Sequence, residues 1–148
     1  MMLRRFILVA LVGAVVAVPL VTPEAQPVDR RQRIVVPPAA RERVLAEMRA
    51  MLESVNGVLR ALATGDLAAG EKAARASGLA TAADVEPEVK RALPPQFLSL
   101  GMQTHRGFDR VAEELRAGAA REAIVASLAE VTSLCVACHA AYRLDEAR

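Results

Sequence analysis

The sequence of 148 residues contains no tryptophan, one tyrosine and three phenylalanines, so aromatic residues make up only 3% of it. Hydrophobic residues nevertheless make up 53%, and much of that fraction is alanine, which favours helices and fills little volume. A core built from such residues contains little side-chain volume. The composition therefore suits a helical protein in which a bulky bound group completes the interior.

An excess of one charge is also absent, because 19 Lys and Arg residues face 17 Asp and Glu residues, for a formal net charge of +2. This balance, without any basic run that alternates with aromatics, argues against nucleic acid or an acidic membrane surface as a partner. The sequence also contains no recognisable nucleophile with its base and no general acid–base pair. We therefore expect a protein that is not an enzyme.

The N-terminus has the layout of an export signal. Residues 1–5 form a short positive segment, and residues 6–21 form an apolar run that only Gly13 and Pro19 interrupt. This run is too short to span a membrane comfortably. The sequence therefore predicts an exported protein.

We expect a signal peptide over residues 1–25, a flexible linker over 26–38 and one domain over 39–148. The residues before Ala25 do not form the small-x-small pattern of a cleavage site. Retention of the leader as an N-terminal membrane tether therefore stays open. The expected location is the periplasm, with the chain free or anchored to the inner membrane.

Apolar residues at steps of three and four predict an all-α domain, and no segment alternates long enough to predict a strand. The expected helices cover residues 39–64, 67–76, 96–117 and 120–148, with one further short helix opening at 84–87. The first helix has a broad apolar stripe made of Val44, Leu45, Met48, Met51, Leu52, Val55, Val58, Leu59 and Leu62. Four helices of this kind bury their stripes best as an antiparallel four-helix bundle.

The last of these helices contains the pattern Cys135-Val136-Ala137-Cys138-His139, and C-x-x-C-H is typical of c-type haem attachment. Two thiols add to the two vinyl groups of the porphyrin. Three residues of helix bring the sulfurs to nearly the same face about one turn apart, and His139 then reaches the iron. We expect one covalently attached haem c, held by Cys135 and Cys138 with His139 as iron ligand.

Other uses of the two cysteines fit the sequence less well. A disulfide is common in exported proteins, but haem attachment requires both thiols in reduced form. A thioredoxin-like dithiol normally follows a βαβ pattern, which is absent, and a zinc site needs a fourth ligand that only His105 could supply. A helical interaction module with a redox-switching Cys pair remains the alternative that contains no haem.

With Tyr142 and Arg143 behind the motif, the last helix resembles that of the cytochrome c-prime family (class II c-type cytochromes). The resemblance extends over residues 39–148 as a pattern of helices, and only the last helix matches as a motif. It implies a haem lodged among the helices, His139 as the proximal ligand and, in many members, a homodimer. It also implies that Arg143 contacts a haem propionate.

The resemblance further implies that the first helix covers the opposite face of the haem. Met48 lies there on the apolar stripe and is the expected sixth iron ligand, with Met51 one turn later as an alternative. His105 lies on the inner stripe of the third long helix. It is either a buried hydrogen-bonded histidine or a second axial ligand.

These residues predict one-electron transfer through a low-spin His/Met haem, with redox proteins of the periplasm as partners. The alternative is a five-coordinate haem that binds NO or CO, in which Met48 only crowds the distal face. The sixth iron position therefore decides between the two functions.

Overall fold

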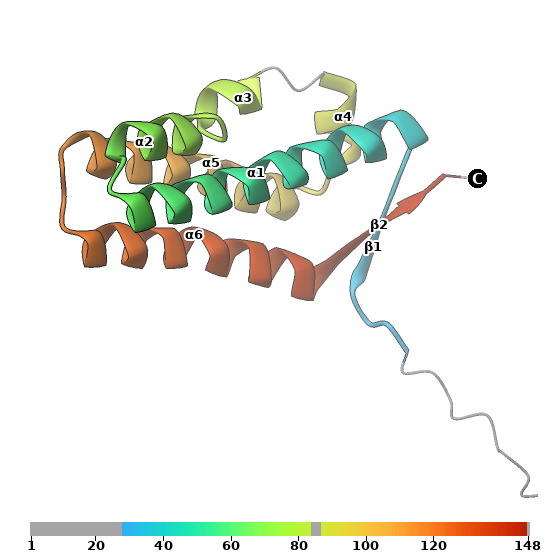
Figure 1. Ribbon diagram of the computed structural model, residues 1–148. Coiled ribbons are helices and arrows are strands. Elements are labelled where there is room, and N and C mark those ends of the chain that lie inside the picture. The colour runs from blue at the N-terminus through green and yellow to red at the C-terminus, as the bar shows by residue number, and fades with distance from the viewer. Residues whose placement is uncertain (1–27, 84–86, 148) are drawn as a thin grey trace, which may run out of the picture.

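The computed structural model describes residues 28–83 and 87–147, and this part of the chain is mostly helical (Figure 1). The expected signal peptide or anchor, residues 1–25, lies outside the described residues. In chain order the elements are β1 (Gln32–Val36), α1 (Pro38–Thr64), α2 (Leu67–Arg75), α3 (Leu79–Ala83), α4 (Pro87–Ala92), α5 (Pro95–Arg116), α6 (Arg121–Ala141) and β2 (Tyr142–Glu146).

The boundaries between the long helices follow from local sequence signals. Gly65 adopts a left-handed conformation (φ 79°), which ends α1 and which glycine reaches without steric cost. The Asp66 carboxylate then accepts a hydrogen bond from the backbone N–H of Ala69 at 3.0 Å and caps α2. Pro95 begins α5, and Gly118 (φ 67°) follows its end. These predicted boundaries are confirmed.

The four longest helices pack in sequence: α1 against α2, α2 against α5 and α5 against α6. Consecutive members of this series run in opposite directions (Figure 1). Between α5 and α6 the approach is close at Gly107, where an added Cβ would lie 2.6 Å from Cγ2 of Val131. Among the described residues, α1 and α6 do not form a comparably close pair.

The buried apolar residues divide into two clusters at opposite ends of the helices. The first core joins α1, α2, α5 and α6 near the connection between the last two, and contains Val58, Leu62, Ala74, Phe108, Val111, Ala112, Leu115, Ile124, Leu128 and Val131. The second core contains Ile34, Val36, Ala40, Val44, Val89, Leu93 and Phe97, and Cys138 and Met48 pack against it. The cysteine motif therefore lies at the end of the molecule where the second core is built.

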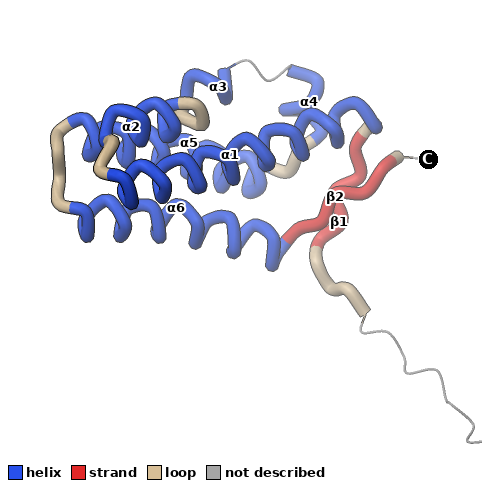
Figure 2. Tube along the Cα trace, viewed as in Figure 1, coloured by secondary structure: helices blue, strands red, loops and turns tan. Residues whose placement is uncertain are grey.

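The sequence did not predict a two-stranded parallel sheet, in which β1 pairs with β2 so that Gln32 lies opposite Tyr142 (Figure 2). The expectation of a flexible linker over residues 26–38 is wrong for β1, because Ile34 and Val36 are buried in the second core. The expected continuation of the last helix to the end of the domain is also wrong. The chain turns extended at Tyr142, which lets β2 hydrogen-bond to β1.

The apolar stripe of α1 is wider than the face that the fold buries. Val44, Val58 and Leu62 are buried as expected, but Leu52 is 69% exposed and Leu59 is 49% exposed. Because α1 packs closely on α2 and not on α6, one edge of the stripe stays uncovered. The short helix expected at residues 84–87 falls mainly on residues 84–86, outside the described part of the chain, and α4 begins next to them.

Candidate cofactor site

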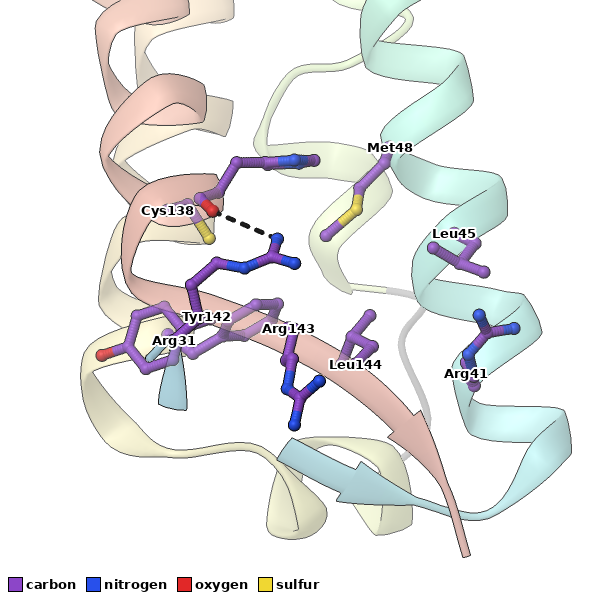
Figure 3. A pocket seen from close by; sticks show the side chains of 10 residues that line it. Arg31, Arg41, Leu45, Met48, Cys138, Tyr142, Arg143 and Leu144 are labelled. Atoms are coloured by element: carbon purple, nitrogen blue, oxygen red, sulfur yellow. Dashed lines mark hydrogen bonds between the residues drawn. The ribbon is translucent and has the colours of Figure 1, made fainter. Parts of the chain in front are cut away.

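A hollow of about 230 Å³ opens between α1, the last turn of α6 and β2 (Figure 3). Its walls combine apolar side chains with three guanidinium groups and are formed by Arg31, Arg41, Leu45, Met48, Phe97, Cys138, His139, Tyr142, Arg143 and Leu144. The sequence singled out Met48, Cys135, Cys138, His139 and Arg143 for a common site. The fold brings four of them to one hollow, whereas Cys135 is not among the residues that line it.

The two cysteines are free thiols on one face of the last turns of α6. Both are half-buried, and Cys138 packs against the second core. Burial raises the pKa of the Cys135 thiol. Burial, followed by the neighbouring Cys135, also raises the pKa of the Cys138 thiol. Both sulfurs are therefore protonated and uncharged at neutral pH.

This environment disfavours a redox-active dithiol. Reactive cysteines have a lowered pKa, commonly because they lie at a helix N-terminus, where the helix dipole stabilises a thiolate. Cys135 and Cys138 lie at the opposite, C-terminal end of α6, where the dipole disfavours negative charge. Residues 28–83 and 87–147 also contain no cluster of three or more His, Cys, Asp and Glu side chains able to hold a metal ion.

Two residues of α1 face the motif across the hollow. Met48 and Leu45 both line the hollow from α1, and Met48 points toward the side of Cys138 (Figure 3). Met48 is half-buried and packs on the second core, whereas Met51 packs on the first core and does not line the hollow. Sequence reasoning named Met48 and passed over Leu45, although both belong to the same apolar stripe.

Three arginines from different elements meet at the hollow: Arg31 from the segment before β1, Arg41 from α1 and Arg143 from β2. The sequence predicted only Arg143. The buried Nε of Arg143 has no hydrogen-bond partner within the described residues. A buried donor without a partner costs about 1–3 kcal/mol, so an acceptor supplied by a ligand would relieve that cost.

Comparison with known proteins gave no match. No family model, no curated protein and no solved structure matches this chain. The chemistry of the site therefore rests on the residues themselves.

The residues of the hollow fit a haem. Its apolar walls suit a porphyrin, its arginines suit the two carboxylates of a haem, and the free thiol of Cys138 lies in its wall. Cys135 precedes Cys138 by three residues on α6 and does not itself line the hollow. The volume is below the roughly 300–1,000 Å³ of pockets that enclose drug-sized ligands. A ligand as large as haem would therefore be partly enclosed between α1 and α6, with an edge open to solvent.

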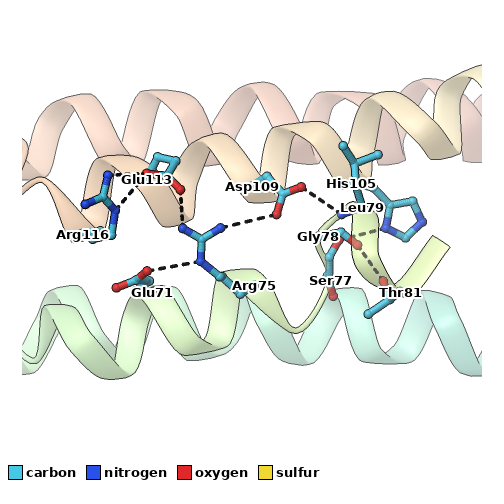
Figure 4. A network of polar contacts seen from close by, with 10 residues as sticks. All are labelled: Glu71, Arg75, Ser77, Gly78, Leu79, Thr81, His105, Asp109, Glu113 and Arg116. Atoms are coloured by element: carbon cyan, nitrogen blue, oxygen red, sulfur yellow. Dashed lines mark hydrogen bonds and ion pairs between the residues drawn. The ribbon is translucent and has the colours of Figure 1, made fainter. Parts of the chain in front are cut away.

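His105 does not belong to this site. It is 4% exposed, and its Nδ1 donates a hydrogen bond to the carbonyl oxygen of Ser77 at 2.9 Å (Figure 4). Its Nε2 lies 3.1 Å from Oε1 of Glu47. Burial lowers the pKa of His105, but the hydrogen bonds with Glu47 and Ser77 and the charge of Glu47 outweigh burial and raise it above 6.5. The interpretation of His105 as a buried, hydrogen-bonded histidine is confirmed, and both ring nitrogens are engaged.

A polar network beside His105 links α2 to α5 (Figure 4). Arg75 forms ion pairs with Glu71, Asp109 and Glu113, and Asp109 Oδ2 accepts a hydrogen bond from the backbone N–H of Leu79 at 3.0 Å. These charges are exposed or half-exposed, and they satisfy one another. The network fixes the turn after α2 and has no contact with the hollow.

Proposed function

We propose that this protein is an exported mono-haem c-type cytochrome that transfers one electron at a time. Cys135 and Cys138 hold the haem, His139 binds its iron and Met48 supplies the sixth ligand. The helices α1, α2, α5 and α6 form a four-helix bundle around it, in line with the resemblance to the cytochrome c-prime family. The protein is not an enzyme under this proposal.

The observation that carries the proposal is the meeting of the C-x-x-C-H motif with Met48 at one hollow. Cys138 and His139 line the hollow from α6, and Met48 lines it from α1. Met48 and His139, 91 positions apart in the sequence, thus line the same hollow, which supports their proposed roles as the two iron ligands. A haem supplies the one-electron change at its iron, and a His/Met pair raises its reduction potential.

Under this proposal the protein's own side chains attach the haem, orient it and surround it. Cys135 and Cys138 would hold the haem through thioether bonds, in which each S–H adds across a vinyl group and no oxidant is needed. Cys135 and Cys138 are free thiols, which is the reduced state that this attachment requires. Leu45, Phe97 and Leu144 contribute apolar side chains to the wall of the hollow.

The proposed location is the periplasm, with the N-terminal segment removed or kept as an inner-membrane tether. Redox proteins of the periplasm are the proposed partners, a homodimer is the proposed assembly, and nucleic acid is not a proposed partner. A haem that the hollow encloses only in part would suit redox proteins as partners, because electron transfer between proteins needs only a close approach to the haem edge.

A five-coordinate haem that binds NO or CO is the second candidate. It is favoured by Leu45, an apolar side chain that lines the hollow from α1 alongside Met48. If Leu45 covers the iron, the distal side has no ligand to offer and a small gas can bind.

Expression of the full chain in a host with intact cytochrome c maturation tests the proposal. A haem stain that survives denaturing electrophoresis would establish covalent attachment, and a colourless protein would overturn the proposed function. Optical spectra of both oxidation states with and without CO then separate the two candidates. Low-spin bands without a CO response indicate electron transfer, whereas high-spin bands that shift with CO indicate gas binding.

A further inference from the structure

The N-terminal arm, defined as residues 29–36, is docked beside the hollow. Its strand β1 pairs in parallel with β2, and Gln32 lies opposite Tyr142, three residues after His139. Ile34 and Val36 anchor the arm in the second core. The arm therefore forms part of the surroundings of the haem motif, although the sequence suggested only a linker there.

Arg31 extends from the arm to the last turn of α6. Oδ1 of Asp29 accepts hydrogen bonds from the backbone N–H of Arg31 at 3.1 Å and from its Nε at 3.0 Å, and Oδ2 accepts from Nη2 at 2.7 Å. These bonds hold the pKa of Asp29 well below its usual range. The remaining nitrogen, Nη1, donates to the carbonyl oxygen of His139 at 3.5 Å (Figure 3). Asp29 thus fixes the guanidinium of Arg31 against the haem motif.

The positively charged side chains at the hollow favour the binding of an anion. Arg31, Arg41 and Arg143 all line it, and no Asp or Glu of the described residues does so. Each arginine also pairs with carboxylates that do not line the hollow: Arg31 with Asp29, Arg41 with Glu42 and Glu146, and Arg143 with Asp29 and Asp145. Guanidinium groups prefer the planar, bidentate geometry of carboxylates, and such bonds are stronger than neutral ones.

We propose that Arg31, held in place by Asp29, binds a carboxylate of the ligand in the hollow. This inference rests on the proposed function, under which the carboxylate is a haem propionate. The N-terminal arm then delivers a cofactor-binding residue from outside the helices. Arg31 joins Arg143 at the same edge of the site, and Asp29, which also lies 3.6 Å from Nη1 of Arg143, links the two.

Arg33 provides a matched control on the same strand. It is 59% exposed, its Nε donates to Oδ2 of Asp145 at 2.6 Å, and it does not line the hollow. Arg31→Gln and Arg33→Gln therefore remove the same charge from the same arm, and only the first removes it from the site. Arg31→Lys keeps the charge without the bidentate fork.

The experiment uses the haem-loaded full chain, with resonance Raman spectra of the propionate bending bands and potentiometric titration of the iron. Arg31→Gln should shift the propionate bands and lower the midpoint potential, because loss of a nearby positive charge favours the ferric state. Arg33→Gln should leave both unchanged, and Arg31→Lys should restore the potential more than the band positions. Asp29→Asn keeps the guanidinium of Arg31 but removes the carboxylate that holds it in place. This variant should therefore shift the propionate bands in the same direction as Arg31→Gln.

Unchanged bands and potential in Arg31→Gln would overturn the inference, as would equal shifts in Arg31→Gln and Arg33→Gln, which would indicate a general effect of the arm. If either of these results is obtained while the wild-type protein stains for covalent haem, the role of Arg31 is wrong but the proposed function stands. Wild-type protein without covalent haem would overturn the proposed function itself, so the two failures are distinguishable.

Discussion

The Nε2 of His105 lies 3.1 Å from a carboxylate oxygen of Glu47, and this contact joins α5 to α1 in the interior of the protein. The opposite ring nitrogen donates to the carbonyl of Ser77. Since carboxylate and carbonyl oxygens only accept hydrogen bonds, the ring makes both bonds best when both nitrogens carry protons. The pair therefore ties the stability of the fold to pH.

We expect this stability to be greater near pH 6 than near pH 8. The pKa of His105 is raised above 6.5 in the folded state, so its contribution is complete below pH 6.5 and is lost as pH rises through the higher folded value. Urea unfolding at both pH values measures the difference. In Glu47→Gln the pH dependence should shrink, and an unchanged slope would show that another group produces it.

Truncation of either cysteine tests haem attachment. Cys135→Ala or Cys138→Ala leaves one thiol to form a single thioether, so the haem stain on a denaturing gel should weaken, and the double variant should show none. Ser133→Ala, an exposed change on the same helix, should stain as the wild type does. Full staining in both single variants and in the double variant would refute the attachment assignment.

Replacement of Met48 tests the sixth ligand. Met48→Leu is close in volume and should cost less than about 1.5 kcal/mol of stability, but it should convert a low-spin haem to high spin if the sulfur binds iron. Met51→Leu is the control, because Met51 packs on the first core away from the hollow. An unaltered spectrum in Met48→Leu would favour the gas-binding candidate if the haem is already high spin.

Docking of the N-terminal arm depends on its buried residues. Ile34 is 3% exposed, so Ile34→Ala should lower the free energy of unfolding by about 2–5 kcal/mol. Val35, its neighbour on the same strand, is 51% exposed, and Val35→Ala should change stability by no more than about 0.5 kcal/mol. Chemical denaturation compares the two, and equal losses would mean that β1 is not anchored through one face.

Two glycines of α5 should respond in opposite ways to alanine. A Cβ at Gly107 would lie 2.6 Å from Val131, so Gly107→Ala should push α5 from α6 and cost about 1–3 kcal/mol. Around Gly101 there is no heavy atom within 4 Å of an added Cβ, so Gly101→Ala should stabilise the helix by about 0.5–1 kcal/mol. Thermal unfolding of both variants, with a loss at position 107 and a gain at 101, would verify the close approach of α5 and α6.

The helical part of the fold was readable from the sequence because its signals are local. Gly65, Asp66 and Pro95 act on the backbone next to them, and each marks a boundary in the structure. The pairing of β1 with β2 has no such signal. It joins distant segments, and the only local trace was the alternation of Ile34 and Val36, too short to distinguish a strand from a linker.

The same distinction applies to the candidate site. Cys138 and His139 belong to a contiguous motif, and Met48 lies on a periodic stripe, so sequence reasoning could bring them together. Arg31 could not be predicted, because its place at the hollow depends on the strand pairing that the sequence did not reveal. Leu52 was assigned to the interior because periodicity gives the direction of a face but not whether a neighbour covers it.

The parallel pairing of the two strands also imposes an order in time. Arg33 and Asp145 form their ion pair across 112 residues, and contacts of such separation form late because a long loop has to close first. By this argument the helices, whose contacts are more local, form before β1 pairs with β2. Under the proposed function, a haem that reaches Cys138 early would meet this end of the molecule before the N-terminal arm covers it.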